Sequence, residues 1–255
     1  MESKINQLMK QWPKGTVGTA PWLQRCGAYR QLVRQYVAGG WLQPFERGAF
    51  ARAGDSPDWR GGLFALQTQL HLDVHAAATT ALSLKGLGHY LPLGGRPVVY
   101  LFGAPGTRLP AWFARHSWEA EIRYTSPALF VPSVPESFMS VEQGEFSIRV
   151  SAPERAMLEV CHLATTNAAI EHLPELMAGL NTLRPQVVQS LLEACRSSKA
   201  KRLFLWSAET AGHEWFSRLS PDKLDLGKGK RQLYRGGRWD PKYKITVPGK
   251  EDAHV

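Results

Sequence analysis

The sequence is poor in cysteine and has no long hydrophobic run. Its 255 residues include three cysteines, Cys26, Cys161 and Cys195, which lie far apart and form no CxxC pair. This spacing argues against a zinc site and against a disulfide framework, so we interpret the cysteines as small buried hydrophobic residues. No stretch approaches the roughly 18 uncharged apolar residues of a membrane span, and residues 1–15 lack the apolar core of a secretory signal. We therefore expect a cytoplasmic protein with no membrane partner.

Recognisable catalytic motifs are also missing. Residues 99–106, VYLFGAPG, suggest a strand and a glycine turn, but they lack the Gly-Lys-Ser/Thr ending of a phosphate loop. No HExxH spacing accompanies His71, His75 and His89, which favours structural histidines over metal ligands. No Gly-x-Ser-x-Gly nucleophile elbow is present. The sequence therefore predicts no catalytic residue, no metal site and no cofactor.

Positive charge is concentrated at the two ends of the chain. The net charge is +9, and residues 1–58 carry 8 Lys and Arg against 4 Asp and Glu. Residues 59–198 carry 10 basic against 11 acidic residues, and residues 199–255 carry 13 basic against 7 acidic residues. Two basic ends around a neutral middle indicate two anion-binding surfaces, for which nucleic acid is the commonest partner.

Residues 28–38 have the pattern of a DNA recognition helix. At about 100° per residue, one arc of roughly 140° collects the apolar side chains Tyr29, Leu32, Val33, Tyr36 and Val37. The opposite side carries Arg30, Gln31, Arg34 and Gln35. Arginine and glutamine are the long side chains that reach guanine and adenine edges in a major groove. We therefore expect these four residues to read bases.

The flanking segments complete a winged helix-turn-helix. Ser3 and Thr19 are expected to cap two short helices before the recognition helix. Segments 41–45 and 49–52 are expected to pair as a β-ribbon with a turn at residues 46–48. Besides the recognition helix, the expected DNA contacts are Lys14 and Thr19 on phosphate, with Arg47 and Arg52 on the wing.

The sequence after the winged helix-turn-helix indicates a mixed α/β domain. We therefore expect the protein as a whole to belong to the α+β class. A helix is expected to start at Ser56 because Trp59, Leu63, Leu66 and Leu70 repeat at helical spacing. Short strands are predicted at 98–102, 122–125, 128–131, 138–141 and 146–150. We expect a DNA-binding domain over residues 1–55 and a second domain over residues 56–255, which a boundary near residue 150 could subdivide.

The last hundred residues are expected to begin helical and to close with strands. Ser151 and Glu154 have the spacing of a capping box for a helix that ends at Leu163. A further helix is predicted at 183–195. Residues 203–206 would suit a buried strand, but the length of the segment 202–211 favours a helix, and short strands are predicted at 224–226, 231–234 and 243–247. This region contains six basic residues that could form a second phosphate track, dock an acidic protein or simply meet solvent: Lys199, Lys201, Arg202, Lys228, Lys230 and Arg231.

Several runs resemble the AbiEi-type antitoxins, the transcriptional regulators of type IV abortive-infection toxin-antitoxin systems. They are KINQLMKQWPKGTVGTAPWL, RQLVRQYVAGGWLQPFERGAF, GGLFALQTQL and TTALSLKGLGHYLPLG, followed by KRLFLWSAE, LDLGKGKRQL and YKITVP. The resemblance implies a winged helix that binds inverted repeats in its own promoter, and a C-terminal antitoxin domain that counters a cognate nucleotidyltransferase toxin. The toxin's own Gly-Ser and Asp-x-Asp pattern is missing here. Ala28 and Tyr29 stand where Ser or Asn caps many recognition helices, so the operator sequence does not transfer.

These observations favour a DNA-binding autorepressor and antitoxin. Its expected partners are double-stranded promoter DNA with inverted repeats and the toxin, bound directly or countered indirectly. We expect a monomer or weak dimer that binds DNA cooperatively, with the six basic residues of the last third contributing to antitoxicity. Two alternatives remain open: a non-catalytic interaction module whose basic face binds an acidic protein, and a nucleic-acid-modifying enzyme of unrecognised type.

Overall fold

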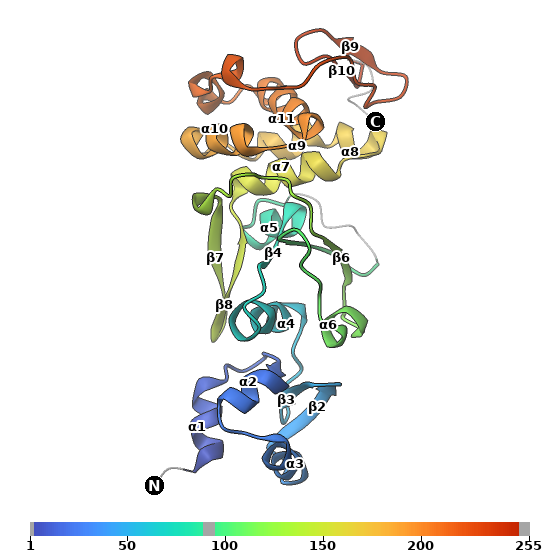
Figure 1. The fold of residues 1–255 in the computed structure, drawn as a ribbon. Helices are drawn as coiled ribbons and strands as arrows, with labels where there is room; N and C mark the ends of the chain where they lie inside the picture. The colour runs from blue at the N-terminus through green and yellow to red at the C-terminus, as the bar shows by residue number, and fades with distance from the viewer. Residues whose placement is uncertain (1–2, 89–94, 250–255) are drawn as a thin grey trace. The chain divides into compact units, whose positions relative to one another are not determined.

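The structure is a computed structural model that describes residues 3–88 and 95–249, and it confirms the predicted α+β fold (Figure 1). His89 lies outside the described residues. The chain forms two compact units. The first comprises residues 1–76, 92–127 and 140–149, and the second comprises residues 77–91, 128–139 and 150–255. Within the described residues, no helix combines the length and the apolar character needed to cross a membrane.

The chain begins with a winged helix-turn-helix. Its helices are α1 (Lys4–Gln11), α2 (Ala20–Arg25) and α3 (Arg30–Ala38), and its strands are β1 (Gly18–Thr19), β2 (Leu42–Glu46) and β3 (Ala49–Arg52). The strands form an antiparallel sheet in the order β1-β3-β2. Ser3 and Thr19 accept hydrogen bonds from the amides of Asn6 and Trp22, so both predicted N-caps are confirmed.

A small aromatic core fixes the three helices. Trp12 is completely buried among Leu8, Leu23 and Val33, and its indole nitrogen donates to the Thr16 carbonyl at 3.1 Å. A Cβ atom at position 18, where β1 begins, would lie 2.4 Å from the Trp12 ring, which explains the glycine there. Burial of this indole therefore sets the path of the chain from α1 into the sheet.

The rest of the first unit is built on a mixed sheet. Helix α4 (Trp59–Phe64) continues as one π-helical segment, η1 (Ala65–Gln69), and β4 (Val74–Ala76), β5 (Val98–Gly103), α6 (Ala111–Arg115) and β6 (Glu121–Thr125) follow. With β7 (Phe138–Gln143) and β8 (Phe146–Ser151), the sheet has the order β6-β5-β4-β8-β7. The expected helix start at Ser56 is wrong, because Asp58 is the N-cap of α4 and accepts from the amides of residues 60 and 61.

Helix α4 and η1 are bonded directly to the winged helix-turn-helix. The buried Gln69 accepts from the Thr19 amide at 2.8 Å and donates to the Val17 carbonyl at 2.8 Å. A Cβ atom added to Gly61 would lie 1.9 Å from the Gly15 carbonyl oxygen. Residues on both sides of position 55 therefore share one packed unit.

The second unit is largely helical. It contains α5 (Ala78–Leu84), η2 (Pro135–Ser137), α7 (Pro153–Leu163), α8 (Asn167–Glu171), α9 (Leu173–Ala178), α10 (Pro185–Ala194) and α11 (Ser198–Ala211). The turns η3 (Glu214–Arg218) and η4 (Pro221–Lys223) lead to a hairpin of β9 (Arg238–Asp240) and β10 (Ile245–Val247). Helix α7 packs against α5 and α11, and the predicted helix over 202–211 is confirmed as part of α11.

Two carboxylates of α7 are buried and hydrogen-bonded. Glu159 accepts from Arg155 Nε at 2.8 Å, from Ser151 Oγ at 2.8 Å and from the Ala78 amide at 3.0 Å. Glu154 binds the side chain and the amide of Arg184. The predicted capping box is therefore wrong: Ala152 is the N-cap of α7 without a side-chain bond, and Ser151 and Glu154 have other partners.

Three predicted strands are also corrected. Residues 128–131 contribute one isolated bridge, Phe130 to Cys195, and residues 231–234 contribute one from Arg231 to Ile245. Residues 224–226 form no strand. The sequence patterns did not predict β4, α6, α8 or α9, which are three to six residues long. Elements this short carry too few residues to establish a period.

Candidate nucleic-acid interface

Helix α3 is held by one apolar side and presents a polar side. Val33 is buried in the core, and Leu32, Tyr36 and Val37 pack partly buried against it. The expectation that Tyr29 also faces inward is wrong, because it precedes the helix as N-cap and is 63% exposed. Its side chain makes no capping hydrogen bond, in agreement with the missing Ser or Asn.

The four predicted base-reading residues are all exposed on α3. Arg30 and Arg34 lie one turn apart on one flank, and Gln31 and Gln35 lie about 100° further around the helix. None of them forms an ion pair or a side-chain hydrogen bond with another described residue. Their donors and acceptors are therefore free to bind an external ligand.

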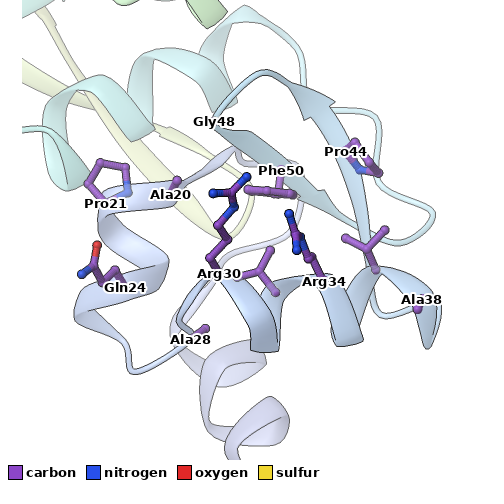
Figure 2. Close-up of a pocket in the computed structure, with 12 residues that line it drawn as sticks. Ala20, Pro21, Gln24, Ala28, Arg30, Arg34, Ala38, Pro44, Gly48 and Phe50 are labelled. Carbon is purple, nitrogen blue, oxygen red and sulfur yellow. The ribbon is translucent and has the colours of Figure 1, made fainter.

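A groove of about 670 Å³ runs beside the arginine flank of α3. Figure 2 shows Arg30 and Arg34 extending from α3 into the space between α2 and the β2–β3 hairpin. The walls are mostly apolar and small, and they include Ala20 and Pro21 at the start of α2 and Phe50 on β3. The groove thus places the two guanidinium groups of α3 between the N-terminus of α2 and the β2–β3 hairpin. Recognition helix, preceding helix and hairpin are the three parts that a winged helix uses on DNA.

The hairpin tip lies next to the start of α2. Gly48 has a φ of +83°, and its carbonyl accepts from the Ala20 amide at 2.9 Å. The preceding Arg47 is exposed at the turn, so its side chain can extend away from the fold. Glu46 at the end of β2 contacts His116 Nδ1 at 3.1 Å, which ties the hairpin to the loop after α6.

Two of the other predicted DNA contacts have structural roles. Thr19 is 1% exposed, and its hydroxyl caps α2, so it cannot offer a side chain to phosphate. Arg52 Nη1 donates to the Trp12 carbonyl at 2.8 Å, and its side chain is half-buried. Lys14 has an exposed side chain, while its amide donates to Glu145 at 2.9 Å. The sequence predicts the capping role of Thr19, whose partner lies three residues away, but it could not reveal the role of Arg52, because Trp12 lies 40 residues before it.

The predicted C-terminal basic patch divides into three residues held within the fold, two of them buried, and three exposed residues. Lys201 and Arg202 are 6% and 1% exposed, and Lys199 Nζ donates to the Ala164 carbonyl at 2.8 Å. Burial lowers the pKa of Lys199 from its ordinary value. The patch is therefore corrected to Lys228, Lys230 and Arg231, which are exposed.

No cluster of three metal-binding side chains occurs within residues 3–88 and 95–249. Cys161 and Cys195 are buried, and burial raises the pKa of both thiols, so they are poor nucleophiles at neutral pH. Cys26 is partly exposed and also has a raised pKa, chiefly from burial. His75 is buried against the ring of Phe102.

Comparison with known protein families identifies the family of this chain. Residues 1–93 match the family described as the N-terminal domain of the AbiEi antitoxin transcriptional regulators. Residues 96–248 match the family described as transcriptional regulator, AbiEi antitoxin, type IV TA system. The chain belongs to the AbiEi antitoxin family. The recognised resemblance is thereby confirmed over both halves of the chain, and this AbiEi protein is a transcriptional regulator of a type IV toxin-antitoxin system.

No curated protein matches the chain. Among solved structures, the crystal structure of the RV2827C protein from Mycobacterium tuberculosis is similar with a TM-score of 0.55 and 16% sequence identity. The similarity covers 95% of this chain and 89% of that one. At this identity the likeness supports the fold of the AbiEi protein.

Proposed function

We propose that this AbiEi protein represses its own promoter by inserting α3 into the major groove of DNA. The observation that supports this most strongly is the groove beside α3, where Arg30 and Arg34 are exposed and free between the start of α2 and the hairpin. A bidentate arginine is the commonest specific partner of guanine, and glutamine pairs in the same way with adenine. Gln31 and Gln35 extend this polar surface around the helix.

The remaining contacts are assigned from exposure. Arg47 at the hairpin tip is exposed, and it reaches a minor groove or its flanking phosphates when α3 occupies the adjacent major groove. Lys14 contacts phosphate with its exposed amino group. Thr19 and Arg52 support the module and make no proposed side-chain contact with DNA. We assign DNA binding to residues 1–55. Two copies of the protein that associate weakly on DNA would occupy the two halves of an inverted repeat.

Antitoxin activity is assigned to residues 56–255, against a cognate nucleotidyltransferase toxin. The basis is membership of an antitoxin family together with the basic surface that remains exposed at Lys228, Lys230 and Arg231. The test is survival of cells that express the toxin and the AbiEi protein from independent promoters. Charge reversal at the three positions should reduce survival, whereas undiminished protection by the folded variant would refute the role of this surface.

A competition shift assay tests the DNA proposal. Arg34→Ala should weaken binding to the protein's own promoter by about 1–3 kcal/mol and relax base preference at one position. Lys14→Ala should weaken binding to all duplexes alike and reduce the salt dependence by about one phosphate contact. Arg218→Ala, an exposed arginine of η3, is the charge-matched control that should change neither.

Equal affinity of the unmodified protein for its promoter and for random duplex would refute base readout. In that case the mostly apolar wall of the groove, with Ala20, Pro21 and Phe50, favours a protein segment as the ligand. That alternative requires toxin neutralisation to be lost when Arg30 and Arg34 are replaced. It is contradicted if those variants protect cells fully.

A further inference from the structure

The segment 222–244 of the second unit is strongly basic. It contains eight lysines and arginines and three aspartates. Within residues 228–244, Lys242 is paired with Glu209 of α11, but six exposed cations form no ion pair with any described residue: Lys228, Lys230, Arg231, Arg235, Arg238 and Lys244. Six unpaired cations on 17 consecutive residues repel one another, so this conformation must be held by other contacts.

The buried Arg202 holds the segment in place. From α11 its guanidinium donates to four backbone carbonyls, those of Leu226, Gly227, Gly229 and Lys244, at 2.8–3.0 Å. The Lys244 carbonyl also accepts from the Arg231 amide at 3.1 Å. Because the carbonyls point inward to Arg202, the neighbouring side chains of residues 228, 230 and 231 are left at the surface.

An exposed indole lies among these cations. Trp239 on β9 is 37% exposed, and its backbone is fixed by pairing with Thr246 of β10. The ammonium group of Lys230 lies 5.3 Å from the centre of the Trp239 ring. The structure therefore combines an exposed indole on a paired strand with a track of cations that form no ion pair, one of which, Lys230, lies over the ring.

We infer that the surface formed by Lys228, Lys230, Arg231, Arg238 and Trp239, here named the C-terminal basic surface, binds single-stranded nucleic acid. A base without a pairing partner stacks on the indole of Trp239, and the four cations follow the phosphates on either side. An acidic protein would use the cations and leave the indole exposed, whereas a duplex presents no free base face. Single-strand binding surfaces combine these same two components, and base stacking on an aromatic side chain tolerates many sequences.

This assignment goes beyond the proposed function and does not depend on it, because its test contains neither toxin nor promoter. The full-length protein is titrated into fluorescently labelled single strands of about ten nucleotides, oligo-U RNA and oligo-dT DNA, and anisotropy is recorded. Both strands should bind, with a salt dependence that reflects released counterions. A tenfold preference for RNA would indicate a further contact to the 2′-hydroxyl. Equal affinity for RNA and DNA would indicate that stacking and charge account for the binding.

Matched variants separate stacking from charge and from misfolding. Trp239→Ala should weaken single-strand binding about tenfold, while Trp239→Phe should retain most of it because a ring remains. Replacing Lys228 and Lys230 by Ala should lower the slope of affinity against salt by about 0.7 for each lost phosphate contact. Arg218→Ala and Trp41→Ala, which remove an exposed cation and an exposed indole elsewhere, should have no effect.

The inference is overturned if Trp239→Ala binds both strands as tightly as the unmodified protein with the same melting temperature. It is also overturned if neither strand binds under conditions in which promoter duplex does bind, an outcome that leaves the proposed function intact. Conversely, single-strand binding that depends on Trp239 in a protein unable to recognise its promoter supports the inference and refutes only the proposed function. Displacement of the strands by poly-glutamate, with no effect of Trp239→Ala, would assign the surface to an acidic protein and overturn the inference.

Discussion

Removing the carboxylate of Glu159 should destabilise the second unit more than any surface change. Glu159 has no exposed side-chain area and accepts hydrogen bonds from Arg155, Ser151 and the Ala78 amide. In Glu159→Ala, the guanidinium of Arg155 loses its carboxylate while it remains between the rings of Phe130 and Phe138, at 4.4 and 4.3 Å. An uncompensated buried charge of this kind costs about 3–5 kcal/mol.

The expected loss can be measured as a melting temperature. For a protein of this size, 1 kcal/mol corresponds to about 2–4 °C, so Glu159→Ala should unfold about 6–20 °C below the unmodified protein. Glu193→Ala is the control, since that glutamate is exposed on α10 and bonds only to Gln189 of its own helix among the described residues. It should change stability by less than about 0.5 kcal/mol.

A double replacement distinguishes lost charge pairing from lost packing. Arg155→Met combined with Glu159→Leu removes both charges, and it should recover part of the stability lost in Glu159→Ala, because no buried charge is left alone. Below its transition, each variant should bind promoter DNA as the unmodified protein does. A melting temperature within about 1 °C of the unmodified protein for Glu159→Ala would refute the reasoning.

Three further outcomes follow from single contacts. Arg52→Ala should lower the melting temperature by removing the bond to the Trp12 carbonyl, at a cost of about 1–3 kcal/mol, and it should leave the DNA affinity of the folded protein unchanged; lost affinity at unchanged stability would contradict the structural role. Gly61→Ala should lower the urea midpoint markedly, because its Cβ would overlap the Gly15 carbonyl and force the backbone to shift, and an unchanged midpoint would refute this close approach. Burial alone would raise the pKa of Glu154, but hydrogen bonds from Arg184 hold it below its ordinary value of 4.5. Its stabilising contribution is therefore complete above that value and is lost as the pH falls through the lower pKa of the folded state. Glu154→Gln should flatten the acid side of a plot of melting temperature against pH. Parallel curves for the variant and the unmodified protein would refute this contribution of Glu154.

The amino-acid sequence by itself determined the local features of the DNA-binding module. The spacing of Leu32, Val33, Tyr36 and Val37 predicts α3, because a helix with one apolar stripe must turn its other residues to solvent. Ser3 and Thr19 predict two helix starts because their hydroxyls reach amides only three residues away. Each of these signals depends on neighbours in the chain, so no tertiary contact is needed to interpret it.

Only the tertiary structure decided which polar residues are available to a ligand. Arg202 looks like a surface cation in the sequence, yet it bonds carbonyls 24 to 42 residues further along. Arg52 donates to a carbonyl 40 residues before it, and Thr19, whose backbone amide donates to Gln69 50 residues further along, is buried. The physical reason is that a charged or hydroxyl side chain becomes structural when packing brings an unpaired backbone group to it, and such groups leave no period in the sequence. Arg30, Arg34 and Arg47 remain exposed because no such group is brought to them.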